Sequence, residues 1–201
     1  MDFQEKQILF KVRKTVLEMI RDRGIIVPET EDITFEQFNV KHNNNNLDIF
    51  INNELSNVKY YIYFHNDIKN FSKADLKSVM SKIIAKYEDE SINLILILKE
   101  KENSSITKEL TKDTYKNVEV FLRKNMVFNI THHTFQPKFS ILSKDEEKEL
   151  IDKYYTTKSK LPKMSKNDPI AKYYGIKSEQ IFKIIRKSPE VGESIYYRLV
   201  R

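Results

Sequence analysis

The chain has 201 residues, of which 32% are charged and 40% hydrophobic, and its formal net charge at pH 7 is +6. It contains no cysteine, which excludes disulfides, thiol nucleophiles and cysteine-ligated zinc. Its three glycines, Gly24, Gly175 and Gly192, lie too far apart to form a phosphate-binding loop, so nucleotide binding through such a loop is also excluded.

The charge is unevenly distributed along the chain. Residues 1–127 carry 20 basic and 20 acidic side chains, whereas residues 128–201 carry 15 basic and 9 acidic ones. The whole excess of +6 therefore belongs to the last third. This shift in character predicts two domains, 1–127 and 128–201.

The first residues are charged and lack the apolar core of a signal peptide. The longest purely apolar run, 94–98, is far shorter than the ~20 residues that cross a membrane. We therefore expect a soluble intracellular protein with no membrane partner. Nothing in the sequence indicates a cofactor or a small-molecule ligand.

The first half alternates helical and strand patterns, which predicts an α/β domain with a mixed sheet and flanking helices. Apolar residues recur at helical spacing over 5–23, followed by Gly24 at a position that ends helices. Capping signals at Thr34 and Ser72 predict two further helices, the second reaching Tyr87. A fourth helix is expected over 106–115, and strands over 47–51, 58–64, 93–98 and 118–122.

The second half predicts a small α+β domain. Residues 129–135 have a strand pattern, and a capping box at Ser143 opens a helix that we expect to run through Tyr155. Asp168 and Pro169 then begin a short helix that Gly175 ends. Residues 181–186 and 194–200 read as a terminal β-hairpin, so the fold as a whole is expected to be α+β.

Histidines give little support for a metal site. His132 and His133 are adjacent, so on a strand they would point to opposite faces, and His42 and His65 lie in other segments. We therefore expect no metal ligands.

Three residues fit the pattern of metal-dependent nucleases of the restriction type, in which carboxylates hold the ion and a lysine helps to activate water. These are Asp48, Asp67 and Lys69. The chain contains many carboxylates, and Asp67 falls beyond the apolar part of its strand. A Mg²⁺-dependent nuclease is therefore an alternative interpretation, and chance is the preferred one.

Basic side chains line the face of the first helix that lies opposite its apolar stripe. They are Lys6, Lys11, Arg13, Lys14, Arg21 and Arg23. Such a face is either simply solvated or follows a phosphate backbone without reading bases. Weak, non-specific contact with duplex DNA is the functional interpretation, and a free nucleic-acid-binding module is a further alternative.

Several C-terminal segments resemble one protein family. Residues 130–137, 161–162 and 168–177, then 183–186 and 197–200, are similar in order to the C-terminal domain of the RNA polymerase subunit 5 family, which also has archaeal members. Residues 11–16 and 22–24 resemble the first helix of the eukaryotic, two-domain form, whose N-terminal domain the archaeal members lack. The chain departs from the family pattern at Phe139, Glu179 and Lys187.

The resemblance implies a non-catalytic subunit of DNA-directed RNA polymerase. Its C-terminal domain would dock on the largest subunit, and its N-terminal, nuclease-like domain would form part of the jaw beside downstream DNA. A cellular copy would act in the nucleus, and a copy from a large DNA virus in the virion or the host cytoplasm.

We expect the residues that carry the resemblance to take part in docking. They are His133, Pro137, Leu161, Pro162, Asp168, Pro169, Ala171, Tyr173, Gly175, Lys183, Arg186, Tyr197 and Arg198. The adjacent pairs 173–174 and 196–197 are tyrosines, which are enriched at interfaces. We expect one tyrosine of each pair to fill the domain's own core instead.

Overall fold

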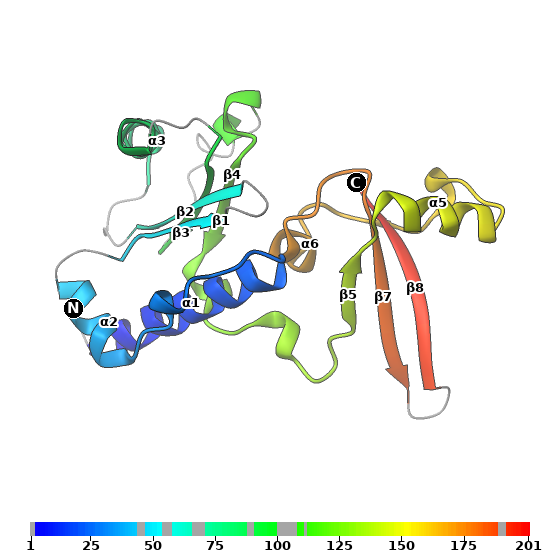
Figure 1. Cartoon of the computed structure of the whole chain (residues 1–201), viewed down its shortest axis with the longest axis horizontal. Coiled ribbons are helices and arrows are strands. Elements are labelled where there is room, and N and C mark those ends of the chain that lie inside the picture. The colour runs from blue at the N-terminus through cyan, green and yellow to red at the C-terminus, as the bar shows by residue number, and fades with distance from the viewer. Residues whose placement is uncertain are drawn as a thin grey trace. The chain divides into compact units, whose positions relative to one another are not determined.

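A computed structural model describes residues 3–43, 47–53, 58–65, 71–87, 91–99, 108–110, 112–188 and 192–201. The chain forms two compact units, Met1–Phe128 and Asn129–Arg201, called here the N-terminal and C-terminal units (Figure 1). Each unit combines helices with its own four-stranded sheet. The fold is α+β, as the sequence predicted.

The N-terminal unit is built on a mixed sheet of strand order β1-β2-β3-β4. The strands are β1 (Ile49–Asn53), β2 (Val58–His65), β3 (Asn93–Leu98) and β4 (Val118–Leu122). β1 runs antiparallel to β2, and the other two pairs are parallel. Helix α3 (Lys73–Tyr87) connects β2 to β3, because parallel neighbours need a long crossover.

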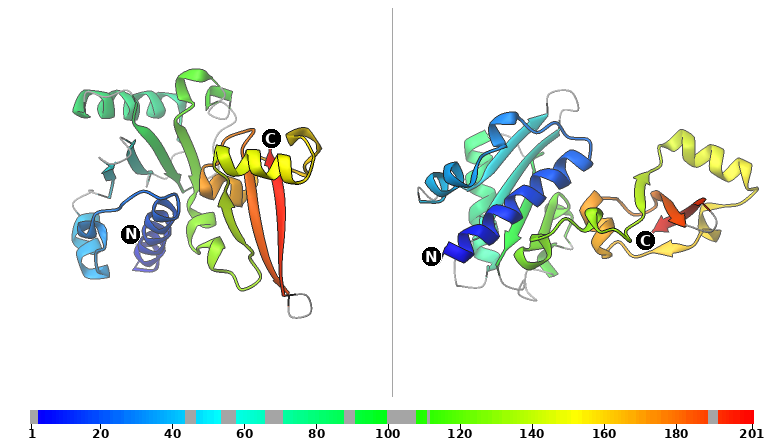
Figure 2. Two further views of the ribbon diagram at one scale, coloured as in Figure 1. Left: turned by 45° about the vertical axis from the view of Figure 1, so that its right-hand side comes forward. Right: turned by 90° about the horizontal axis from the view of Figure 1, so that it is seen from below.

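Two helices cover the two faces of this sheet. α1 (Phe3–Asp22) lies on one face and α3 on the other, as the two views of Figure 2 show. The unit also contains α2 (Phe35–Asn43) and three short 3₁₀ turns, η1 (Glu29–Glu31), η2 (Asp113–Tyr115) and η3 (Arg123–Met126).

The apolar run of β3 is explained by this double cover. Leu94, Leu96 and Leu98 are buried in one cluster with residues of α3. Ile95 and Ile97, also buried, alternate with them and therefore point to the face that α1 covers. The prediction of a central strand buried on both sides is confirmed.

The end of α1 shows the local geometry that its sequence predicts. Gly24 has a left-handed φ of +80°, its amide donates to the Arg21 carbonyl at 2.8 Å, and the Ile25 amide donates to the Ile20 carbonyl at 3.2 Å. This pair of hydrogen bonds is a Schellman motif, which satisfies carbonyls at the end of a helix.

The C-terminal unit contains a sheet of strand order β5-β7-β8-β6. The strands are β5 (Lys138–Ile141), β7 (Ile181–Ser188), β8 (Gly192–Val200) and β6 (Lys163–Met164). β7 and β8 pair antiparallel along their whole length, which confirms the predicted hairpin. β5 is antiparallel to β7, and the two-residue β6 is parallel to β8.

The two helices of this unit pack in different apolar clusters. α6 (Pro169–Tyr174) shares a cluster with Phe182 and Ile184 of β7. α5 (Lys144–Lys153) contributes to a second cluster with Ile181 and Leu199, which are partners across the hairpin. Since side chains alternate along a strand, the two helices serve opposite faces of the sheet. The 3₁₀ turns η4 (Ile130–His132) and η5 (Lys158–Lys160) lie outside these helices.

The ends of α6 follow the predicted local chemistry. The Asp168 carboxylate accepts a hydrogen bond from the Ile170 amide at 2.9 Å, and Pro169 occupies the first helical turn. Gly175 ends the helix with a φ of +60°. The predicted capping box of α5 is also present, with Ser143 and Glu146 as its two members.

Two sequence-based predictions for the C-terminal unit were wrong. Residues 129–135 form no strand: the Asn129 side-chain oxygen accepts hydrogen bonds from the Thr131 amide and hydroxyl, at 2.9 and 2.7 Å, and closes the η4 turn. α5 ends at Lys153 and not at Tyr155, whose φ of +47° is incompatible with a continuing helix.

The helix expected over 106–115 is confirmed only in part. Among its described residues, 108–110 are helical and 113–115 form η2, whereas 106, 107 and 111 lie outside the described residues.

Candidate functional site

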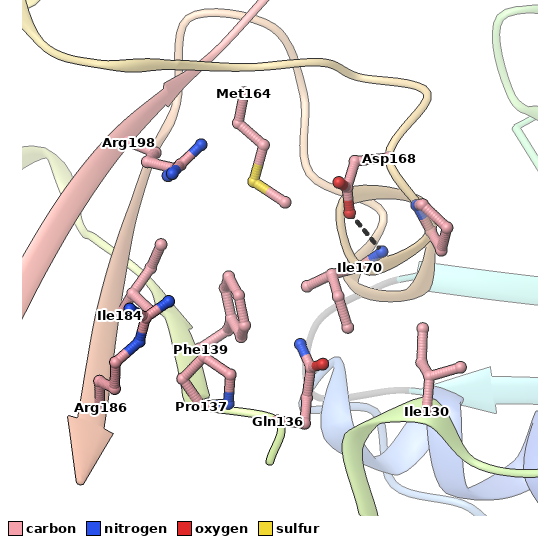
Figure 3. Close-up of a pocket in the computed structure, with 11 residues that line it drawn as sticks. Ile130, Gln136, Pro137, Phe139, Met164, Asp168, Ile170, Ile184, Arg186 and Arg198 are labelled. Carbon is pink, nitrogen blue, oxygen red and sulfur yellow. Dashed lines mark hydrogen bonds between the residues drawn. The ribbon is translucent and has the colours of Figure 1, made fainter. Parts of the chain in front are cut away.

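A groove opens on the face of the C-terminal sheet that α6 covers, with a volume of about 470 Å³ (Figure 3). We call it the α6 groove. Its lining residues come from the segment before β5, from all four strands of the sheet and from the N-terminal end of α6. They are Ile130, Gln136, Pro137, Phe139, Met164, Asp168, Pro169, Ile170, Ile184, Arg186 and Arg198.

The α6 groove has an apolar floor. Phe139 and Ile184 are cross-strand partners of β5 and β7, so their side chains share a face. Met164 and Ile170 belong to the same buried cluster, against which Phe139 packs. Phe139 also meets the buried Phe182 ring edge to face, at a centroid distance of 5.3 Å. The floor is thus the edge of the unit's own core.

Two arginines from the hairpin border this floor. Arg186 and Arg198 are both exposed, and Figure 3 shows their guanidiniums on the hairpin side of the groove, with Asp168 on the α6 side. The Arg186 guanidinium lies 5.6 Å from the centre of the Tyr196 ring, which favours an ordered side chain. The Asp168 carboxylate accepts a hydrogen bond from the Ile170 amide. The hairpin side of the groove is therefore basic.

The structure brings five of the thirteen predicted docking residues together in this groove. They are Pro137, Asp168, Pro169, Arg186 and Arg198. They come from four segments of the chain that the fold brings together.

Three other predicted docking residues shape the unit from within or end its helix. Ala171 and Tyr173 are 1% and 2% exposed, and the Tyr173 hydroxyl accepts a hydrogen bond from the Asn129 amide group at 2.9 Å. Gly175 ends α6. Ala171 and Tyr173 therefore belong to the core rather than to a contact surface, while the neighbouring Tyr174 is half-buried.

A further group lies away from the groove. Leu161 and Tyr197 pack against the cluster beneath α5, and Lys183 is the cross-strand partner of Tyr197, so it faces the same side. The Pro162 carbonyl accepts a hydrogen bond from the Leu199 amide. Tyr196 is 50% exposed. Of each tyrosine pair, one ring thus packs against the core, completely for Tyr173 and partly for Tyr197.

His133, the remaining predicted docking residue, is exposed in the turn after η4. Its Nδ1 accepts a hydrogen bond from the Phe135 amide at 3.3 Å. It does not line the α6 groove.

Sequence reasoning missed part of the groove floor. Met164 and Ile184 were not assigned a role, because their participation depends on pairing between segments that are distant in the chain. The local signal is their spacing: Phe182, Ile184 and Arg186 are two residues apart on a predicted strand, which places their side chains on one face.

The predicted basic face of α1 is only partly a surface feature. Lys11 and Lys14 are exposed, and neither forms an ion pair with a residue that the structure describes. Lys6 donates to the side chain of Asn43 at 3.0 Å, and Arg21 pairs with Asp32 at 2.6 Å.

The inclusion of Arg13 in this face was wrong. Arg13 is 2% exposed, forms an ion pair with Glu31 and donates to the Leu47 carbonyl at 3.4 Å. Burial lowers the pKa of its guanidinium. Arg13 lies four residues from both Leu9 and Leu17, which are buried, so helical spacing already places it beside the apolar stripe.

Arg23 was also assigned to the wrong environment. Its side chain is 5% exposed, and two guanidinium nitrogens donate to the Glu119 carboxylate at 2.9 and 2.7 Å. Burial by itself lowers the pKa of Arg23, but the adjacent Glu119 more than reverses this and the pKa is raised. The pair joins the end of α1 to β4 and does not offer a charge to solvent.

Of the three candidate nuclease residues, the structure describes only Asp48. The Asp48 carboxylate accepts hydrogen bonds from the Tyr61 hydroxyl at 2.8 Å and the Phe64 amide at 3.2 Å. Burial raises the pKa of Asp48. Asp67 and Lys69 lie outside the described residues.

Among the residues that the structure describes, no three histidine or carboxylate side chains cluster as metal ligands do. Within the same residues, every helix is too short or too polar to cross a bilayer.

The fold defines a two-unit α+β protein, and its C-terminal unit carries the α6 groove, with an apolar floor and a basic border. Two family models match the chain: that of the RNA polymerase Rpb5 N-terminal domain over residues 4–83, and that of the Rpb5 C-terminal domain over residues 128–200. The chain belongs to the Rpb5 family of RNA polymerase subunits. It is accordingly an accessory, non-catalytic subunit, and the nuclease alternative is set aside.

Full-length relatives support this assignment. The chain is 30% identical to the rpabc1 subunit of DNA-directed RNA polymerases I, II and III of Dictyostelium discoideum, over 95% of the chain and 96% of that protein. It is 29% identical to the RPABC1 subunit of Caenorhabditis elegans, over 99% and 98%. It is also 29% identical to subunit 5C of RNA polymerase V of Arabidopsis thaliana, over 98% and 85%.

Proposed function

We propose that the C-terminal unit docks the chain onto the largest subunit of a multi-subunit RNA polymerase, and that the α6 groove forms the centre of this interface. The observation that carries the proposal is the groove itself, with an apolar floor of about 470 Å³ and two exposed arginines at its border. The residues that dominate binding energy cluster in well-packed pockets near the centre of an interface, and arginine is enriched among them.

The groove chemistry favours a partner segment with both apolar and acidic side chains. Apolar side chains would fill the space above Phe139 and Met164, and carboxylates would pair with the guanidiniums of Arg186 and Arg198. The excess of basic residues in the last third of the chain acts in the same direction.

For the N-terminal unit we propose a place in the polymerase jaw, beside downstream duplex DNA. The support is the exposed pair Lys11 and Lys14, with Lys6 and Arg21 on the same helix. Contacts of this kind neutralise phosphates and carry no sequence information. Arg13 and Arg23 hold the unit together and take no direct part.

The place of action follows from the assembly. The relatives are subunits of eukaryotic polymerases, so a cellular copy acts in the nucleus. For a viral copy the corresponding place is the virion or the host cytoplasm.

Docking is tested by affinity purification of the full-length tagged chain from cells that supply the polymerase. Arg186→Glu combined with Arg198→Glu reverses both groove charges. We expect it to reduce the recovered largest subunit by roughly tenfold or more, because the introduced carboxylates would meet the carboxylates of the partner segment and like charges at an interface repel.

The matched control combines Lys148→Glu with Lys160→Glu, two exposed lysines outside the groove. It changes the net charge equally and should leave recovery near that of the unmodified chain. Equal loss in both double variants would contradict the groove as the docking site.

A further inference from the structure

The outer edge of β8 is open along most of its length. On one side β8 pairs with β7 from Gly192 to Leu199, whereas on the other side β6 pairs only with Leu199 and Val200. Within the described chain, no strand pairs with residues 192–198 on that side. Figure 1 shows β8 as the outermost long strand of its sheet.

Two backbone hydrogen bonds establish which groups face this open side. The Leu199 amide donates outward, to the Pro162 carbonyl of the β6 segment, at 2.9 Å. The next amide, of Val200, donates to the Gln180 carbonyl on the β7 side, also at 2.9 Å.

Backbone groups of an antiparallel strand alternate in direction. The amides and carbonyls of Glu193, Ile195 and Tyr197 therefore share the outward direction of Leu199. They form a ladder of hydrogen-bonding groups beside β8 that no described strand of the chain occupies.

The side chains along the edge differ between the two faces of the sheet. On the groove face stand Tyr196 and Arg198, with Arg186 lying over the Tyr196 ring. On the opposite face stand Ile195, which is 52% exposed, and Tyr197, which is half-buried. One face of the edge is thus basic and the other apolar.

We propose that this edge receives an extended segment of another polymerase subunit as an added strand. The segment carries carboxylates on the face beside Arg198 and apolar side chains on the face beside Ile195, in strict alternation. Main-chain hydrogen bonds to Ile195 and Tyr197 provide the attachment, and the alternating side chains provide specificity. The inference rests on the proposed docking function of the C-terminal unit.

Sheet edges are normally protected by proline, bulges or cover. The open part of β8 contains no proline and presents Ile195 instead. The other edge strand, β5, has four residues and follows Pro137, which has no amide proton to offer. β8 is therefore the edge suited to strand addition.

Charge and hydrogen-bonding chemistry select the occupant. The last third of the chain carries 15 basic and 9 acidic residues, so a second copy brings like charge to the same edge. A nucleic acid has no alternating amides and carbonyls to match the ladder. An acidic, extended polypeptide satisfies both requirements.

The test variant is Ile195→Pro in the full-length tagged chain. Because the Ile195 amide faces outward, proline removes a donor for the added strand but no hydrogen bond of the β7–β8 hairpin. The matched control Ile195→Thr keeps the amide proton. We expect Ile195→Pro to reduce the recovered polymerase by roughly tenfold relative to Ile195→Thr.

Amide exchange supplies a second readout that a loss of folding does not mimic. In the unmodified free chain, we expect β7 to protect the amides of Ser194 and Tyr196, and we expect those of Ile195 and Tyr197 to exchange fast. In the polymerase complex, Ile195 and Tyr197 should slow by roughly tenfold or more.

Unchanged recovery with Ile195→Pro, or unchanged exchange at Ile195 and Tyr197 in the complex, would overturn the added strand. If the double reversal of Arg186 and Arg198 still reduces recovery in that case, the docking function stands without it. Protection of the same two amides in a dimer of the free chain would assign the edge to a second copy and also overturn the proposal.

Discussion

The two units use arginine in opposite ways. In the N-terminal unit Arg13, Arg23 and Arg123 have side chains only 3%, 5% and 6% exposed, and each forms an ion pair with a glutamate. In the C-terminal unit Arg186 and Arg198 stand exposed at the border of an apolar groove. The same planar guanidinium is held in a buried ion pair in one unit and is exposed beside an apolar surface in the other.

This difference changes the meaning of the net charge. A charge of +6 suggests DNA binding, yet the unit proposed to lie near DNA is neutral overall and buries several of its arginines. The basic excess belongs to the unit proposed to bind protein. The environment of each charge, and not their sum, separates the two functions.

The largest difference in the free energy of unfolding is expected between variants that replace a buried arginine of the N-terminal unit and an exposed arginine of the C-terminal unit. Arg13→Ala removes hydrogen bonds to Glu31 and Leu47 and leaves a cavity, while Lys41 remains 3.6 Å from Glu31. We expect the free energy of unfolding to fall by roughly 2–3 kcal/mol. Arg198→Ala should change it by less than about 0.5 kcal/mol, as surface substitutions do.

The measurement is unfolding in urea, followed by amide exchange so that each unit is observed separately. The β3 amides report on the N-terminal unit in Arg13→Ala, and the β7 amides report on the C-terminal unit in Arg198→Ala. Similar losses in both variants would remove the distinction between structural and recognition arginines.

The cap of α6 supplies a smaller effect. Asp168→Ala removes the side chain that accepts from the Ile170 amide, and should reduce the stability of the C-terminal unit by about 1 kcal/mol. Asn167→Ala, an exposed neighbour whose side chain does not cap the helix, is the control. Thermal unfolding of the two variants would show no difference if the cap were unimportant.

The buried Asp48 carboxyl predicts a pH effect in the N-terminal unit. Burial raises its pKa in the folded state above the ordinary value of 3.8, so the folded state holds the proton more tightly than the unfolded state does. Its contribution to stability is therefore greatest below that ordinary pKa and is lost as pH rises through the raised one.

Asp48→Asn cannot ionise, so it should gain in stability relative to the unmodified chain between pH 4 and pH 7. The measurement is the difference in unfolding free energy at the two pH values. A difference that moves in the opposite direction would mean that Asp48 is stabilised as an anion.

The smallest effect is expected at the exposed lysines of α1. Lys11→Ala and Lys14→Ala should each change the free energy of unfolding by less than about 0.5 kcal/mol. In a polymerase complex they should lower the salt dependence of DNA retention, because each removes a phosphate contact. A stability loss comparable to that of Arg13→Ala would show that they too are structural.

Local features were predictable from sequence because their interactions lie within a few residues. The cap at Asp168, the end of α6 at Gly175 and the Schellman motif at Gly24 all involve neighbours along the chain. The hairpin of β7 and β8 was predictable for the same reason.

The α6 groove was predictable only in part. Phe139 and Ile184 meet because β5 pairs with β7, although the two residues lie 45 positions apart in the sequence, and no local pattern fixes that register. The burial of Arg23 likewise depends on Glu119, which is 96 positions away. The turn at Asn129 was misread because the β-branched and aromatic residues of 130–135 favour a strand, and this preference outweighed the capping chemistry of one asparagine.

In the proposed arrangement the C-terminal unit faces a polymerase subunit, while helix α1 of the N-terminal unit faces DNA. Site-specific photocrosslinking in the assembled polymerase tests both at once, with the crosslinking residue placed at Gln136 in the α6 groove or at Lys14 on α1. We expect Gln136 to crosslink to the largest subunit and Lys14 to downstream DNA. Crosslinks from Gln136 to DNA, with none to the largest subunit, would contradict this arrangement.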